Sequence, residues 1–132
     1  MKTKFYEEDD CVVYWDDSNE WVYVDWKNKP SVETVKRGCE EILKLLFQKG
    51  TSKVLNDNRN VIGSWYLASQ WVSDDWFPRM MKAGLKKFAW IQSKASPMSQ
   101  LSARNSEMRN QDMDVIHLYN DEPEAIHWLK QF

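Results

Sequence analysis

Four consecutive polar residues carry the side chains best suited to bind a ligand. They are Asp57, Asn58, Arg59 and Asn60, directly after a short apolar run. A guanidinium such as that of Arg59 can hold an anion through two parallel hydrogen bonds, and the amides both donate and accept. Open α/β sheets bind ligands at the carboxyl ends of their strands, where this stretch would lie if residues 53–57 form a strand. The alternative is a turn whose polar side chains only cap the next helix.

Tryptophans follow this polar stretch closely. Trp65, Trp71 and Trp76 lie in the next helical segment and would bring flat apolar surface to the same end of the sheet. We therefore predict, as an alternative to a protein-contact role, a site for a small ligand such as a lipid or an anionic metabolite. Its expected residues are Asp57, Asn58, Arg59, Asn60, Trp71 and Trp76.

No set of residues has the spacing of a catalytic or metal site. Acid–base catalysis needs two carboxyl groups in different environments within a few ångströms, and nothing in the spacing brings Asp57 near Asp74 and Asp75. His117 and His127 fall on different predicted elements without a Cys/His cluster, whereas metal sites need several closely spaced ligands. We expect no catalytic residue, no metal and no cofactor.

Composition excludes several classes of protein. The 132 residues carry 18 Lys and Arg against 20 Asp and Glu, a net charge of −2, which argues against nucleic-acid binding. The basic residues between Arg79 and Lys87 are then most simply a solvated face. Eighteen aromatic residues exclude general disorder, and no apolar run approaches the ~18 residues of a membrane helix.

The N-terminus and the cysteines favour a cytoplasmic protein. The basic start runs directly into acidic residues, whereas a secretion signal continues with an apolar stretch. Cys11 and Cys39 lie in a strand-like and a helix-like segment, and we expect buried thiols and no disulfide.

Strands alternate with helices after an opening hairpin. Residues 11–15 and 21–26 predict the hairpin, and within 21–26 the side chains of Val22, Val24 and Trp26 alternate with those of Trp21 and Tyr23. Helices are predicted over 31–49, 97–109 and 121–132. Another helical segment is predicted from 65 to 83, with a break near 74–78. Further strands are predicted over 53–57, 86–93 and 114–120. This order predicts a single α/β domain over residues 1–132 with a largely parallel sheet.

Three segments resemble a known family. They are "KVLNDNRNVIGSW", "WVSDDWFPRMMKAGLKKFAW" and the closing "EPEAIHWL", and the resemblance extends over about residues 10 to 131. The chain looks like the bacterial SpoIIAA-like branch of the STAS and CRAL-TRIO-like group. The resemblance implies a βα superhelix of about four turns, with helices mainly on one face of the sheet.

The same resemblance implies a non-enzymatic regulatory or scaffolding module that acts through protein–protein contacts. Relatives that are anti-anti-sigma factors carry Asp-Ser-Ser-Gly after a central strand and are phosphorylated on the second serine. Asp57 matches the aspartate by position, but Ser-Ser-Gly is absent here.

Aromatic side chains suggest where a partner would dock. If helices cover one face of the sheet, Trp21, Tyr23, His117 and Tyr119 fall on the other, and Trp90 can join either face. A face with so many exposed rings is typical of an interaction surface, and we predict a homodimer or a regulatory protein partner there. The alternative is that the N-terminal segment or the loops cover these rings.

Overall fold

Antiparallel strands open the chain in the computed structural model, which describes residues 1–93 and 115–131. They are β1 (Lys2–Glu8), β2 (Cys11–Asp16) and β3 (Trp21–Asn28). The hairpin predicted from residues 11–26 is confirmed as β2 and β3. β1 is not among the predicted strands, because its Lys and Glu residues do not show the apolar alternation that indicates a strand. It forms the edge of the sheet, where charged side chains face solvent.

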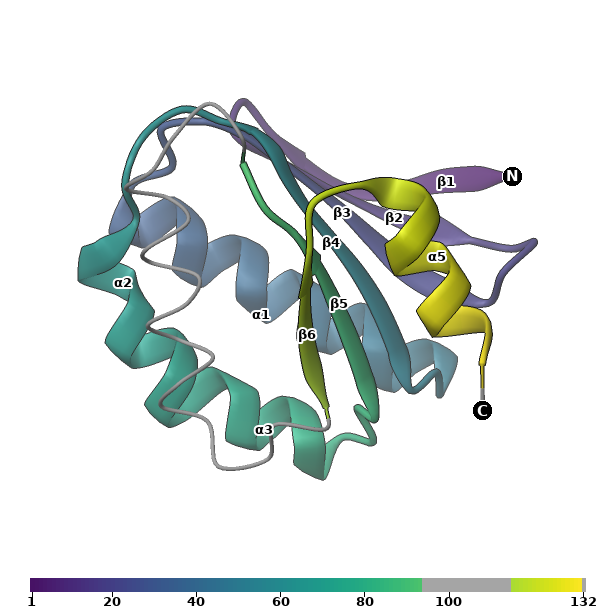
Figure 1. The fold of residues 1–132 in the computed structure, drawn as a ribbon. Coiled ribbons are helices and arrows are strands. Elements are labelled where there is room, and N and C mark those ends of the chain that lie inside the picture. Colours follow the sequence, from purple (N-terminus) through teal and green to yellow (C-terminus); the bar gives the residue numbers. More distant parts are fainter. Residues whose placement is uncertain (94–114, 132) are drawn as a thin grey trace.

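Parallel strands complete the sheet, in the order β1-β2-β3-β4-β5-β6 (Figure 1). They are β4 (Lys53–Val61), β5 (Lys87–Ile91) and β6 (Ile116–Tyr119). β4 is longer than the predicted strand 53–57. The polar stretch from Asp57 to Asn60 is therefore part of a central strand, and the predicted end of this strand at residue 57 is wrong.

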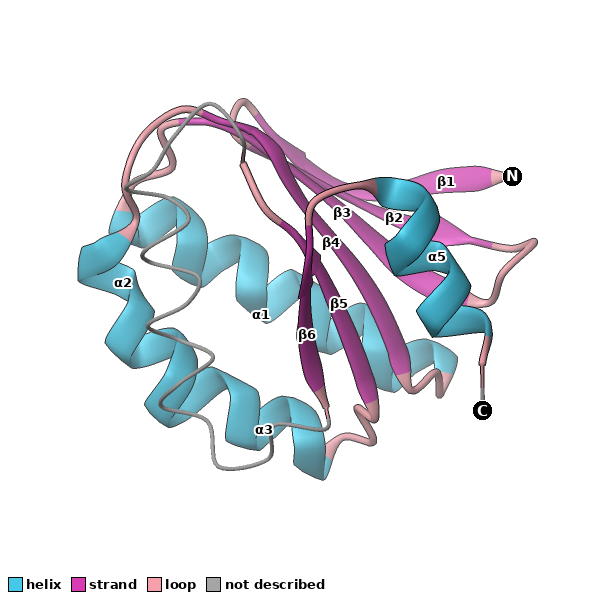
Figure 2. Ribbon diagram, viewed as in Figure 1, coloured by secondary structure: helices cyan, strands magenta, loops and turns pink. Residues whose placement is uncertain are grey.

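One face of the sheet is covered by helices that follow β3 and β4 (Figure 2). Helix α1 (Val32–Lys49) begins where the Ser31 hydroxyl accepts from the Thr34 N–H, and it ends at Gly50, whose φ of 65° suits glycine. After β4 come α2 (Tyr66–Trp71), the π-helix η1 (Val72–Trp76) and α3 (Phe77–Lys82) in direct succession. The irregularity predicted at residues 74–78 is present, but as a π turn and not as a break.

The opposite face carries helix α5 (Glu122–Lys130). Asp121 caps it by accepting from the Glu124 N–H, as its capping-box spacing predicts. The helix predicted over 97–109 lies outside the described residues.

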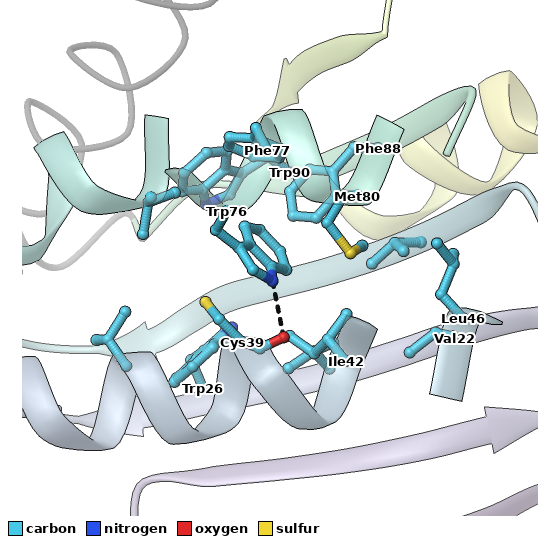
Figure 3. Close-up of a cluster of buried hydrophobic side chains, with 14 of the residues drawn as sticks. Val22, Trp26, Cys39, Ile42, Leu46, Trp76, Phe77, Met80, Phe88 and Trp90 are labelled. Carbon is cyan, nitrogen blue, oxygen red and sulfur yellow. Dashed lines mark hydrogen bonds between the residues drawn. The ribbon is translucent and has the colours of Figure 1, made fainter. Parts of the chain in front are cut away.

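Two apolar cores result, one on each face. The larger lies between the sheet and the helices α1 to α3. Figure 3 shows part of it, including the buried side chains of Trp26, Cys39, Ile42, Trp76 and Phe88. The smaller lies under α5 and consists of Trp21, Leu55, Ala89, Ile91, Ala125 and Leu129. None of the helices in residues 1–93 and 115–131 is long and apolar enough to cross a membrane.

Candidate functional site

Strand β4 sends its polar side chains to both faces of the sheet. Asn56 and Asn58 lie on the side of α1, while Asp57 and Arg59 lie on the side of α5. This follows from the alternation of side chains along an extended strand. The predicted polar site is therefore divided by the sheet, and Asp57 and Asn58 do not contribute to one common pocket.

The two asparagines form a buried chain of hydrogen bonds with Trp26. The indole Nε1 of Trp26 donates to Asn56 Oδ1 at 2.7 Å, and Asn56 Nδ2 donates to Asn58 Oδ1 at 3.3 Å. Asn56 and Asn58 are only 3% and 5% exposed. Buried amides need such partners, and this chain explains how two asparagines are accommodated in a central strand.

These amides border a small cavity of about 30 Å³ between the sheet, α1 and the helical segment of α2 and η1, and we call it the indole–amide cavity. Its described walls are Trp26, Pro30, Val35, Cys39, Asn56, Asn58, Val61, Trp65, Val72, Trp76, Phe88 and Trp90. A single water needs about 10–15 Å³ of such space, so the cavity admits a few atoms at most without movement of its walls. No charged side chain is among these described wall residues.

Two of the four wall indoles have no acceptor for their N–H groups. Trp65 and Trp90 stack with ring centroids 5.3 Å apart, and neither Nε1 atom, buried as it is, has a hydrogen-bond partner in the structure's described part. The other two are satisfied: Trp26 donates to Asn56, and Trp76 donates to the Cys39 carbonyl at 2.7 Å (Figure 3). An unpaired buried donor costs about 1–3 kcal/mol, so this pair is a departure from ordinary core packing.

The π turn brings two side chains to the cavity wall. Val72 and Trp76 stand at its two ends, and Phe77 donates its backbone N–H to the Val72 carbonyl, five residues back. A π turn is wider than an α turn and is frequent at functional sites. Pro78 follows directly, and the wider turn accommodates a residue that has no N–H and would clash with the carbonyl four residues before it.

Arg59 does not present a free guanidinium on the opposite face. It donates to both Asp57 oxygens, at 3.0 and 2.7 Å, and to Glu122 of α5 at 2.7 Å. Tyr23 donates its hydroxyl to Asp57 at 2.7 Å. Burial raises the pKa of Asp57, but the hydrogen bonds from Arg59 and Tyr23 outweigh it and hold the pKa below its usual value. The predicted anion-binding residue is thus occupied by carboxylates of its own chain.

The remaining predicted ligand residues lie apart from the cavity, except for Trp76. Trp71 is only partly buried and stands between Lys36 and Arg79, whose cationic groups are 5.6 and 5.8 Å from its ring centroid. Asn60 is exposed and lies beside Asp25, on the other side of the sheet from Trp76. Burial raises the pKa of that Asp25 carboxyl.

The predicted aromatic docking face is largely covered. Trp21 is 1% exposed under α5, and Trp90 is 3% exposed in the core on the opposite face, so the expectation that they are accessible is wrong. Tyr23, His117 and Tyr119 are partly buried. The cover is α5 itself, because the His117 ring stacks on Trp128 with centroids 4.2 Å apart.

Carboxylates and histidines do not assemble into a catalytic group within residues 1–93 and 115–131. Asp57 faces α5, whereas Asp75 belongs to the π-helix on the other side and pairs with Arg79 at 2.8 Å. His117 stacks on Trp128, and His127 lies in α5. In that part of the chain no three His, Cys, Asp or Glu side chains are placed to hold a metal ion.

Sequence reasoning missed the pairing of Trp65 with Trp90. The two residues are 25 positions apart, and the pairing depends on how the start of α2 packs over the end of β5. One signal was available. Asn56 and Asn58 are alternate residues of β4, and Asn56 lies opposite Trp90 of β5. If β4 had been predicted to extend past Asp57, this alternation would have placed both amides on the same face of the sheet as Trp90.

Comparison with known proteins gives the fold. No family model matches the chain, and no curated protein matches it. Among solved structures, it is similar to an uncharacterised protein of the DUF3478 family with a SpoIIAA-like fold from Shewanella loihica PV-4. That match has a TM-score of 0.53 and 15% sequence identity, and it covers 98% of this chain and 92% of the other. The fold is therefore SpoIIAA-like, as the sequence resemblance implies.

Proposed function

We propose that this SpoIIAA-like protein is a non-enzymatic module that binds a small uncharged molecule in the indole–amide cavity. The observation that carries the proposal is that two wall residues of the cavity, Trp65 and Trp90, have buried indole N–H groups without an acceptor among the described residues. A bound molecule would supply the missing acceptor. The cavity volume favours a ligand much smaller than a lipid, and the described wall residues, none of which is charged, disfavour an anion.

Ligand-induced stabilisation tests this proposal. A ligand that binds only the folded protein raises its melting temperature with concentration, and the eight tryptophans provide a fluorescence signal. We expect uncharged compounds of a few heavy atoms to raise the melting temperature of the wild-type protein. The Trp65→Phe variant keeps most of the ring but lacks the N–H group and should respond less.

A control variant separates the cavity from general packing. Trp21→Phe removes a buried N–H group that also has no partner among the described residues but lies in the other core, under α5. It should leave the response to ligands in place. If no uncharged compound stabilises the wild-type protein at millimolar concentration, the proposal is wrong.

A second candidate function is regulatory or scaffolding contact with another protein, including a second copy of this chain. Three apolar side chains at the junction of β4 and α2 support it: Ile62, Tyr66 and Leu67 are 57%, 52% and 83% exposed. Clustered exposed apolar side chains are typical of protein contacts. This patch replaces the face around Trp21 and Trp90 as the preferred surface.

Sedimentation at micromolar concentration tests the contact with a second copy. We expect a homodimer in the wild-type protein and a monomer in the Leu67→Lys variant. An exposed substitution elsewhere on the same face of the sheet, Gln48→Lys in α1, should leave the dimer intact. A wild-type protein that stays monomeric would exclude the homodimer.

A cytoplasmic location fits both candidates. Cys11 and Cys39 are free and buried, and thiols stay reduced in the cytoplasm. Fractionation of the native host with an antibody to the protein would test the location.

A further inference from the structure

We propose that the ligand of the indole–amide cavity is a small, flat, uncharged carbonyl compound, whose oxygen accepts hydrogen bonds from both Trp65 and Trp90. This inference rests on the proposed function and adds the chemical class of the ligand. It starts from two indole N–H groups that have no partner within residues 1–93 and 115–131.

The unpaired groups at the cavity are donors. Indole Nε1–H donates and never accepts, so each of the two tryptophans requires an acceptor. A carbonyl oxygen has two lone pairs and can accept from two donors at once. The rings stack with an interplanar angle of 22°, so their N–H bonds lie in nearly parallel planes.

Walls and charge restrict the rest of the molecule. Phe88, Trp26 and Trp76 surround the space with aromatic surface, which favours a flat apolar body. Asp57 and Arg59 lie on the opposite face of β4 and are internally paired. On the cavity's own side of the sheet, Arg79 is paired with Glu40 and Asp75. A charged ligand would therefore be buried without a partner, which is costly.

Trp65 is the wall residue best placed to admit such a ligand. Of the four indoles it is the most exposed, at 7%. It stands at the start of α2, where its own side chain makes no capping hydrogen bond and the Ser64 hydroxyl accepts from the Tyr66 N–H instead. The cavity of about 30 Å³ is smaller than a ring compound, so binding requires the Trp65 side chain to move outward.

Indole resonances in a proton–nitrogen NMR spectrum test the inference directly. Protein labelled with ¹⁵N at tryptophan is exposed to cyclopentanone or to methylenecyclopentane, in which a CH₂ group replaces the carbonyl oxygen. Both are delivered as vapour, so that no polar co-solvent competes. We expect cyclopentanone to move the Trp65 and Trp90 N–H signals downfield in a saturable way, and methylenecyclopentane to give no downfield shift.

The chain contains matched controls for this experiment. Trp21 also has a buried Nε1 without a partner in the described residues, but it lies in the other core under α5. Trp76 is already bonded to Cys39. The Trp21 signal should not move, and the Trp76 signal should show no downfield shift because its N–H already has an acceptor. Trp65→Phe and Trp90→Phe assign the two signals, and each should weaken cyclopentanone binding roughly tenfold, as expected for one lost hydrogen bond. If Trp90→Phe fails to fold, Trp65→Phe alone decides the point.

Each alternative result has a definite meaning. If both compounds raise the melting temperature equally and neither shifts the two signals downfield, the cavity binds by shape: the carbonyl inference is overturned and the proposed function stands. If neither compound nor any other small uncharged compound binds, water alone fills the space and both proposals fail. If the Trp21 signal moves as much as those of Trp65 and Trp90, the shift is a general solvent effect and the inference is again overturned.

Discussion

At the scale of single residues, the fold depends on close contacts that leave no room for added atoms. Gly38 lies in the middle of α1, where alanine would favour the helix by about 1 kcal/mol. A Cβ atom at this position would stand 2.6 Å from Trp26 Cη2 and 2.9 Å from Cys11 Sγ. The ring of Trp26 is fixed by its bond to Asn56, so it cannot easily give way.

Gly38→Ala should therefore destabilise the protein in spite of the better helix former. We expect a net loss of about 1 kcal/mol or more, since overpacking costs about 1–3 kcal/mol. Urea unfolding would measure it, with the exposed Gln48→Ala in the same helix as the near-neutral control. A gain in stability would show that Trp26 and β2 can shift apart.

Arg59 provides a second test at this scale, and its effect depends on pH. Arg59→Leu leaves the buried Asp57 carboxylate without its cation, and we expect a loss of about 1–2 kcal/mol at pH 7, below the full cost of breaking a buried pair because Arg59 is partly exposed. The pKa of Asp57 is lowered in the folded protein, so its stabilisation is complete above the unfolded-state pKa and is lost as pH falls through the folded one.

The difference between wild type and Arg59→Leu should therefore shrink below about pH 4. In the variant, burial is no longer opposed by the guanidinium, so protonation of Asp57 relieves the strain. Arg79→Leu serves as the control, because Arg79 pairs with Glu40 and Asp75 at the surface and such pairs contribute less than about 1 kcal/mol. A pH-independent difference would mean that Arg59 acts through packing alone.

At the scale of elements, α5 acts as the cover of the second face. It buries Ala125 and Leu129 against Trp21, Leu55 and Ile91. The Lys87 ammonium group holds the C-terminal end of α5 against the sheet by donating hydrogen bonds to the carbonyls of Trp128 and Gln131, at 3.0 and 2.5 Å.

Removal of residues 121–132 should uncover this apolar surface. We expect the shortened protein to bind the dye ANS and to self-associate at micromolar concentration, because a large exposed apolar patch drives association. Leu129→Ala is a milder variant, with an expected loss of about 2–5 kcal/mol. His127→Ala keeps the buried contacts and should behave like wild type. A shortened protein that stays monomeric without binding ANS would contradict the role of α5.

The elements differ in how far the sequence predicts them. Alternation along residues 21–26 correctly sorts Val22 and Val24 to one core and Trp21 to the other, because one face of β3 is uniformly β-branched or aromatic. The last half of β4 is not predictable in the same way. Asn56 and Asn58 suit a central strand only because of their bonds to Trp26 and to each other, and these partners are 30 and 2 residues away.

The candidate site was predictable only in part, for the same reason. Asn58 and Trp76 belong to both the predicted site and the indole–amide cavity, whereas Asp57 and Arg59 fall on the wrong side of the sheet. A shift of one residue in the pairing register at this point reverses which side chains face each core. The pairing of Trp65 with Trp90 needs the position of α2 over β5, which no local pattern contains.

At the scale of the whole molecule, the sheet joins the two cores into one unit. Every strand pairs with its neighbour in sequence, and β3 to β5 have buried side chains on both faces. Unfolding that separates the helices from one face therefore also disturbs the strands whose other side chains form the second core. We expect residues of the large core to become accessible together, in a single cooperative transition.

The two cysteines make this cooperativity measurable. Cys11 on β2 and Cys39 on α1 are both buried in the large core, and burial raises the pKa of each thiol, so neither forms the reactive thiolate in the folded protein at pH 8. Alkylation by iodoacetamide should therefore proceed only through unfolding, at one rate for both cysteines, as followed by mass spectrometry. Cyclopentanone should slow both equally if it binds the folded state. Faster labelling of Cys11 alone would instead reveal that the β1–β2 edge opens independently of α1, because that opening exposes β2 while Cys39 stays packed against Trp76.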